Sequence, residues 1–144
     1  MDQSRPGDLE AIKQLKARYF RFLDAKEWER FGAVFSDDAV ILPPDGDAPV
    51  ARGRQEIVAR VRGVVEGAVT VHHGHMPEIQ FTSDTTATGV WSMFDLVDYG
   101  DRGWRGYGHY EEEYVKEAGA WKIRSFRLTR LRKDEWGEEQ RPGR

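Results

Sequence analysis

The sequence contains no cysteine among its 144 residues. This absence excludes a disulfide framework, a thiol nucleophile and a metal centre ligated by cysteine. The sequence also lacks any run of about 18 apolar residues, so we expect no membrane-spanning helix and no membrane partner. The first ten residues, MDQSRPGDLE, contain no apolar stretch typical of a signal peptide. We therefore expect a cytoplasmic protein.

Neither sign of charge is in large excess, since 22 Lys and Arg residues face 25 Asp and Glu residues, for a net charge of −3. Nucleic-acid-binding proteins usually carry a basic stripe, so we expect no nucleic acid partner. The residues are 39% hydrophobic and 12% aromatic, which is enough for a folded core. The length suits a single domain, which we expect over residues 1–144, with a core over 8–131 and a charged tail over 132–144.

A helical pattern covers residues 8–23. Its apolar side chains recur in steps of three and four and predict one buried stripe: Leu9, Ile12, Leu15, Tyr19, Phe22 and Leu23. Asp8 is in position to cap this helix. Asp24 followed by Glu27 resembles a capping box for a second, short helix over 28–35.

The second half of the chain is predicted to be β-structure. A short strand over 39–42, an exposed loop over 43–53 and a helix over 54–65 come first. Four long strands follow, joined by hairpin turns, over 69–81, 87–99, 103–116 and 121–131. Long antiparallel strands twist and curl, and helices grouped on one side of them make an α+β domain. We therefore expect a curled antiparallel sheet wrapped around the N-terminal helix, a cone with an internal pocket.

Asp95 is the most unusual residue of this pattern. It lies in VWSMFDLV, where both alternating faces of the strand are apolar. A buried carboxylate costs several kcal/mol unless a partner compensates its charge, which favours a functional site. The structural alternative is a bend at the strand end that lets Asp95 reach water. His72, at the start of the preceding strand, is the candidate partner, because a carboxylate on one ring nitrogen leaves the other free to accept a proton.

His72 belongs to the segment VTVHHGHMPEI, and its structural alternative is one of three solvated histidines at a strand end. Alternation places His73 and His75 on the face opposite to His72. These two could ligate a metal together, but no acidic or cysteine ligand lies at a useful spacing. We therefore predict neither a metal nor a cofactor.

Tyr19 and Asp24 each have an ordinary alternative, as a core tyrosine and as a helix cap. Five helical residues turn by about 140°, so the two side chains converge only if the helix ends near Leu23. In WKIRSFRLTRLR, alternation from Trp121 directs Arg127 inward, and one bulge would transfer that role to Arg130. Tyr107 and His109 are further candidates for a pocket wall.

Three stretches carry a further signal: LKARYFRFLDAKEWERFGAVFSDDAV, VTVHHGHMPEIQFTSDTTATGVWSMFD and GHYEEEYVKEAGAWKI. Together they resemble the SnoaL-like family, a branch of the cone-shaped superfamily that includes nuclear transport factor two, scytalone dehydratase and ketosteroid isomerase. Within the family, the chain is most similar to bile-acid 7α-dehydratases and related small dehydratases. The resemblance implies five site residues, with Arg127 taken ahead of Arg130: Tyr19, Asp24, His72, Asp95 and Arg127.

The resemblance implies a cofactor-independent dehydratase acting on a hydrophobic, steroid-like or polyketide-like hydroxy-ketone. His72, oriented by Asp95, would remove a proton next to the carbonyl. Tyr19 with Asp24 would donate to the substrate oxygen or assist the leaving hydroxyl, and Arg127 would stabilise negative charge. The alternatives are an isomerase or polyketide cyclase with the same base, a non-catalytic small-molecule-binding domain, and the small structural subunit of a ring-hydroxylating dioxygenase. The fold also implies a homodimer or homotrimer.

Overall fold

The computed structural model describes residues 5–137 and has three helices and six strands in that range. The helices are α1 (Pro6–Asp24), α2 (Trp28–Gly32) and α3 (Gly53–Val65). The strands are β1 (Phe35–Leu42), β2 (Ala51–Arg52), β3 (Val69–Phe81), β4 (Thr86–Asp98), β5 (Gly103–Glu117) and β6 (Ala120–Trp136).

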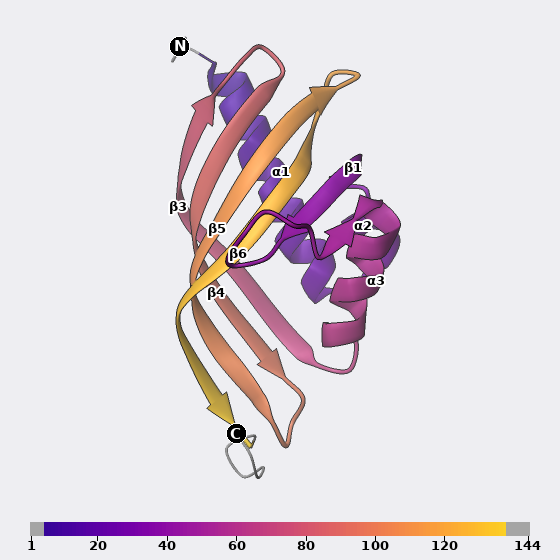
Figure 1. The fold of residues 1–144 in the computed structure, drawn as a ribbon, viewed down its shortest axis with the longest axis vertical. Helices are drawn as coiled ribbons and strands as arrows, with labels where there is room; N and C mark the ends of the chain where they lie inside the picture. The colour runs from indigo at the N-terminus through magenta and orange to yellow at the C-terminus, as the bar shows by residue number, and fades with distance from the viewer. Residues whose placement is uncertain (1–4, 138–144) are drawn as a thin grey trace.

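All six strands form one sheet with the order β2-β1-β6-β5-β4-β3. Every neighbouring pair is antiparallel except β1 and β6, which are parallel. The sheet is curled and unclosed, α1 runs along one of its faces, and α2 and α3 lie beside β1 (Figure 1). The predicted α+β fold, a curled sheet around the N-terminal helix, is confirmed. No helix within residues 5–137 is long and apolar enough to cross a membrane.

The predicted stripe of α1 faces the sheet, with one addition. Ile12, Leu15, Tyr19, Phe22 and Leu23 are buried as expected. A lysine side chain is ordinarily exposed to solvent, but Lys16 is fully buried among these residues. This lysine lies four residues after Ile12 and three before Tyr19, so it occupies the apolar face of the helix.

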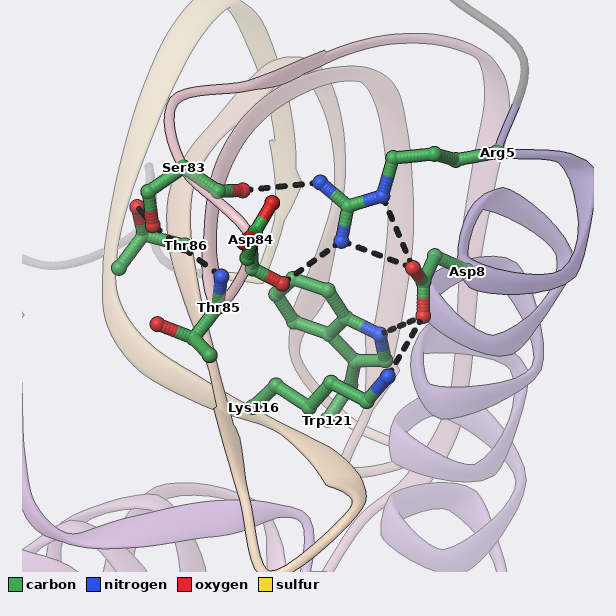
Figure 2. Close-up of polar contacts among 8 residues, drawn as sticks. All are labelled: Arg5, Asp8, Ser83, Asp84, Thr85, Thr86, Lys116 and Trp121. Carbon is green, nitrogen blue, oxygen red and sulfur yellow. Dashed lines mark hydrogen bonds and ion pairs between the residues drawn. The ribbon is translucent and has the colours of Figure 1, made fainter. Parts of the chain in front are cut away.

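The beginning of α1 differs from the prediction. The helix begins at Pro6, so Asp8 lies in the first turn and does not cap it. Figure 2 shows the Asp8 carboxylate receiving hydrogen bonds from Arg5 (2.8 Å), Trp121 (2.9 Å) and Lys116 (3.2 Å). Arg5 also donates to the carbonyl oxygens of Ser83 and Asp84 in the β3–β4 turn. This cluster attaches the first turn of α1 to the β3–β4 hairpin and to the β5–β6 hairpin.

Asp24 and Glu27 form no capping box, which corrects the second capping prediction. Glu27 precedes α2 without a side-chain capping bond, and the Asp24 carboxylate is bonded to β3. Strand β1 begins at Phe35 and α2 ends at Gly32, so the boundary between them lies earlier than expected.

Strand β6 is longer than expected and irregular. It pairs with β5 as far as Trp136, so residues 132–136 are strand where we expected a tail; residues 138–144 of that tail lie outside the described residues. The β5–β6 register shifts twice, between Glu113 and Tyr114 and between Tyr107 and Gly108. At the first shift Arg124 has no partner on β5 and is an extra residue of β6. The alternation of inward side chains therefore stops at Ile123 and resumes, one residue later than expected, at Phe126. This change of phase determines which arginine reaches the interior.

Candidate active site

A cavity of about 500 Å³ lies between the inner face of the sheet, the end of α1, α3 and the segment after β1. Its wall is mostly apolar, with contributions from Leu23, Ile41, Val61, Val65, Val97 and Phe126 among others. The polar residues of the wall inside this apolar surround are Tyr19, His72, Asp95, Tyr110 and Arg130, with Arg60 from α3. Such a cavity suits a mainly hydrophobic small molecule with a few polar groups.

His72 is held by Asp24 through two separate groups. The ring nitrogen Nδ1 lies 2.7 Å from Asp24 Oδ1, and the His72 backbone N–H donates to Asp24 Oδ2 at 2.9 Å. An ionised carboxylate only accepts hydrogen bonds, so Nδ1 carries the proton of this bond and Nε2 retains its lone pair. The His72 side chain is buried and forms part of the cavity wall. The pair therefore presents a basic nitrogen beside an apolar cavity.

Asp24 itself does not belong to the cavity wall. Because α1 continues through Asp24, this carboxylate and the Tyr19 side chain leave the helix in different directions. Asp24 instead borders a shallow hollow outside the cavity, together with His73 and His75. Asp24 therefore acts on a molecule in the cavity only through His72, which corrects the expected convergence of Tyr19 and Asp24 in one pocket.

Asp95 is buried opposite His72 on the neighbouring strand, but its partner is Arg130. The two guanidinium nitrogens Nη1 and Nη2 donate to Asp95 Oδ1 and Oδ2 at 2.9 and 2.8 Å, a bidentate pair. Burial pushes the pKa of Asp95 upward, but the hydrogen bonds and charge of Arg130 outweigh this and hold the pKa below its usual value. Asp24 and not Asp95 therefore orients the His72 ring.

Gly106 makes room for this ion pair. It lies opposite Asp95 on β5, and a Cβ atom at this position would overlap both the Arg130 guanidinium and the Asp95 carboxylate. Glycine is therefore required at position 106, because the Asp95 and Arg130 side chains occupy the space that a Cβ atom would fill.

Arg127, which we expected in the interior, lies outside the cavity wall. Its guanidinium donates to the carbonyl oxygens of Pro43 (2.6 Å) and Gly46 (2.7 Å) and to Asp47 (3.2 Å). The extra residue at Arg124 causes the difference, because it turns Phe126, Leu128 and Arg130 inward. Arg127 therefore holds the loop after β1, and Arg130 takes the interior position.

Tyr19 is a buried residue of the cavity wall and lies beside Tyr110, with ring centroids 6.0 Å apart. Burial raises the pKa of the Tyr19 hydroxyl far above its usual value, and the negative charges of Glu112 and Asp95 add to the effect. A tyrosine is already protonated at neutral pH, and this shift extends that range, so the hydroxyl is a hydrogen-bond donor.

A buried polar network below the two tyrosines was not predicted from the sequence. Lys16 Nζ donates to Glu112 Oε2 at 2.5 Å, and Glu112 Oε1 accepts the Tyr114 hydroxyl at 2.6 Å. The Lys16 ammonium also lies over the ring faces of Tyr19 and Tyr110, 3.6 and 3.7 Å from their centroids. Such cation–π contacts fix the orientation of both rings.

The other histidines lie away from the cavity. His73 and His75 are exposed on the opposite face of β3, with ring centroids 5.8 Å apart. His109 and Tyr107, considered for the pocket wall, do not line the cavity either. Within residues 5–137, no group of three or more His, Asp or Glu side chains is arranged to hold a metal ion.

The chain matches a known protein family. Residues 6–127 match the SnoaL-like domain family, and the chain belongs to it. It is similar to the probable cyclase FGR4 of Gibberella zeae, with 26% identity over 134 residues that cover 83% of this chain and 89% of the relative.

Solved structures share the fold. A putative scytalone dehydratase from Novosphingobium aromaticivorans has a TM-score of 0.79 and 24% identity, covering 92% of this chain and 90% of its own. The hexachlorocyclohexane dehydrochlorinase LinA-type3 from Novosphingobium barchaimii has a TM-score of 0.79 and 19% identity, covering 94% of each chain.

Proposed function

We propose that this protein is a cofactor-independent lyase, a dehydratase acting on a hydrophobic, steroid-like or polyketide-like hydroxy-ketone. The observation that carries the proposal is the Asp24–His72 pair, with its imidazole in the wall of a mostly apolar cavity of about 500 Å³. Membership of the SnoaL-like family supports a reaction of this kind. Two of the similar structures are named as a dehydratase and a dehydrochlorinase, and both names describe elimination reactions.

The reaction is a proton transfer followed by loss of water. His72 Nε2 removes a proton from the carbon next to the ketone, and the electrons of that C–H bond move into the carbonyl group to give an enolate. The enolate then returns to the ketone as its electrons form the new C=C bond and the C–OH bond breaks. The departing hydroxide takes a proton from the His72 imidazolium and leaves as water, which restores the neutral ring. Asp24 keeps the ring in the Nδ1–H tautomer and stabilises the intermediate imidazolium.

Two further groups are available for the substrate oxygens. The Tyr19 hydroxyl is a hydrogen-bond donor, as any protonated tyrosine is at neutral pH, and burial raises its pKa further. The Arg130 guanidinium has N–H donors beyond the two that bond Asp95, and these can stabilise negative charge on the ketone oxygen. The apolar wall strengthens both interactions by excluding water.

An isomerase or cyclase would use the same base. The name of the fungal relative, a probable cyclase, favours this second candidate. The reactions differ in what the substrate does after losing its proton, so the products distinguish them: an enone and water for a dehydratase, and a compound of unchanged mass for an isomerase.

The test is an activity screen of wild type, His72→Ala and His73→Ala against 3-oxo steroids bearing a β-hydroxyl and polyketide-like hydroxy-ketones, with products followed by mass spectrometry. His73 is the matched control, because it is the next residue and lies on the opposite, exposed face of β3. We expect turnover to fall by about 10²- to 10⁴-fold in His72→Ala and to persist in His73→Ala. Equal turnover by the His72 variant would refute the proposal, and tight binding without turnover would indicate a binding domain.

A further inference from the structure

The C-terminal end of α1 has an unusual residue at its turn. The backbone N–H of Glu27 bonds the Phe22 carbonyl (2.9 Å) and that of Lys26 bonds the Leu23 carbonyl (3.1 Å), which together form a Schellman motif. Lys26 occupies the left-handed position of this motif, with φ of 60°. Glycine is the usual residue there, because a side chain in this conformation is strained.

The side chain of Lys26 is connected to the proposed base, His72, through Thr70 and Asp24. Its Nζ donates to Thr70 Oγ1 at 3.0 Å, and Thr70 Oγ1 donates to Asp24 Oδ1 at 3.0 Å. An ammonium group can only donate, so the Thr70 oxygen accepts from Lys26 and its single proton points toward Asp24. The direction of every hydrogen bond in the chain Lys26–Thr70–Asp24 is thereby fixed.

We propose that Lys26, acting through Thr70, is a positioning residue that keeps Asp24 in place as the acceptor for the His72 ring. Asp24 Oδ1 then receives two donors, Thr70 and His72 Nδ1, while Oδ2 receives the His72 backbone N–H. With this arrangement the carboxylate has one stable orientation, and the His72 ring has one tautomer. The consequence for turnover rests on the proposed function, whereas the consequence for the tautomer does not.

The strained backbone distinguishes this role from a purely structural one. A residue that only ended the helix would be better as glycine, which adopts the left-handed conformation without a Cβ clash. Lysine at this position costs stability and gains an ammonium group beside Thr70 and Asp24. Burial lowers the pKa of the Lys26 amine, and the Asp24 charge opposes this, as expected for a cation held near the carboxylate.

The experiment separates the ammonium group from the backbone. Lys26→Met removes the charge and keeps the strained side chain, Lys26→Gly removes both, and Lys26→Arg keeps a cationic donor. The tautomer of His72 is observed directly by long-range ¹H–¹⁵N NMR above the titration range of histidine. We expect the Nδ1–H tautomer in wild type and Lys26→Arg, and a shift of about tenfold toward the Nε2–H tautomer in both Lys26→Met and Lys26→Gly.

The melting temperatures of the same variants should depend on backbone strain and not on the charge. Lys26→Gly, which relieves the strain at this position, should melt above Lys26→Met. A second pair tests the relay: Thr70→Val should shift the tautomer as Lys26→Met does, and Thr70→Ser should not. An unchanged tautomer in Lys26→Met and Thr70→Val overturns the inference. A shifted tautomer in a protein that turns over none of the screened ketones leaves Lys26 as the positioning residue and refutes the lyase proposal alone.

Discussion

Asp24 and His72, 48 residues apart in the chain, are joined at both the ring and the backbone of the histidine. One oxygen of the carboxylate bonds the ring at 2.7 Å, and the other accepts the His72 backbone N–H at 2.9 Å. Asp24, the last residue of α1, therefore fixes two things: the position of the His72 backbone in β3 relative to the helix, and the orientation of the His72 imidazole ring. A single carboxylate connects the packing of the helix on the sheet to the chemistry proposed for the cavity.

Replacing Asp24 by asparagine should impair both functions of the carboxylate. An amide keeps one acceptor oxygen and introduces a donor, so it cannot bond the ring and the backbone of His72 as the carboxylate does. We expect turnover to fall by about 10²- to 10⁴-fold and the free energy of unfolding to fall by about 1–3 kcal/mol. Steady-state kinetics and urea denaturation measure the two effects. Glu27→Gln, three residues further on, is the control, and wild-type turnover by Asp24→Asn would contradict the role of the pair.

Arg127 and Arg130, both in β6, should differ sharply in their effect on stability. Arg130→Met leaves the Asp95 carboxylate buried without its partner, which should lower the free energy of unfolding by about 3–5 kcal/mol. Arg127→Met removes only contacts to the segment over residues 43–47, and about 1–2 kcal/mol is expected. Urea denaturation of both variants provides the comparison. A larger loss for Arg127→Met would show that the interior position had been assigned to the wrong arginine.

Local pattern was enough to assign Asp95 and Tyr19 to the interior. Asp95 stands in a strand with two apolar faces, and Tyr19 lies on the apolar stripe of a helix, so burial of both could be predicted. The proximity of His72 to Asp95 followed from the hairpin, since the two residues are register partners on β3 and β4. Local periodicity was enough for the fold and for these three positions.

The errors lie where a tertiary contact overrides local periodicity. The extra residue at Arg124 depends on how β6 pairs with β5, and without it alternation selects the wrong arginine. The Asp24–His72 contact joins a helix end to a distant strand, and no local pattern reports it. Lys16 was missed because a lysine is solvated by default, although its spacing from Ile12 and Tyr19 placed it on the buried stripe.

Gly106→Ala should disturb the Asp95–Arg130 pair although neither of the two residues is replaced. The added methyl group would overlap both side chains, so the ion pair must open or the strand must shift. We expect a loss of about 1–3 kcal/mol in the free energy of unfolding. Gly63→Ala in α3 is the matched control, because a Cβ atom there meets nothing within 4 Å and alanine favours a helix. Equal stability of both variants would show that Gly106 is not needed for the pair.

Asp8 should make stability depend on pH in the acid range. The hydrogen bond from Trp121, with those from Arg5 and Lys116, lowers the pKa of Asp8 to about 2. A carboxyl with a lowered pKa in the folded state stabilises the protein above its unfolded pKa, and this contribution is lost as the pH falls toward 2. Wild type should therefore exceed Asp8→Asn by roughly 1–2 kcal/mol at neutral pH, and the gap should close between about pH 4 and pH 2. Thermal melts across this range, with Glu10→Gln as control, measure the gap. A gap independent of pH would mean that the Asp8 contacts do not depend on its charge.

The buried Lys16–Glu112 pair should show strong coupling between its members. Burial lowers the pKa of the Lys16 amine and the Glu112 charge opposes this, so each charge is tolerated only because the other is present. Lys16→Met alone leaves a buried carboxylate and should cost about 3–5 kcal/mol in the free energy of unfolding, whereas Lys16→Met with Glu112→Gln should recover part of that loss. A double-mutant cycle by urea denaturation gives the coupling energy. Additive losses would show that the two charges are stabilised separately, by the aromatic rings around Lys16 and by the Tyr114 hydroxyl bonded to Glu112.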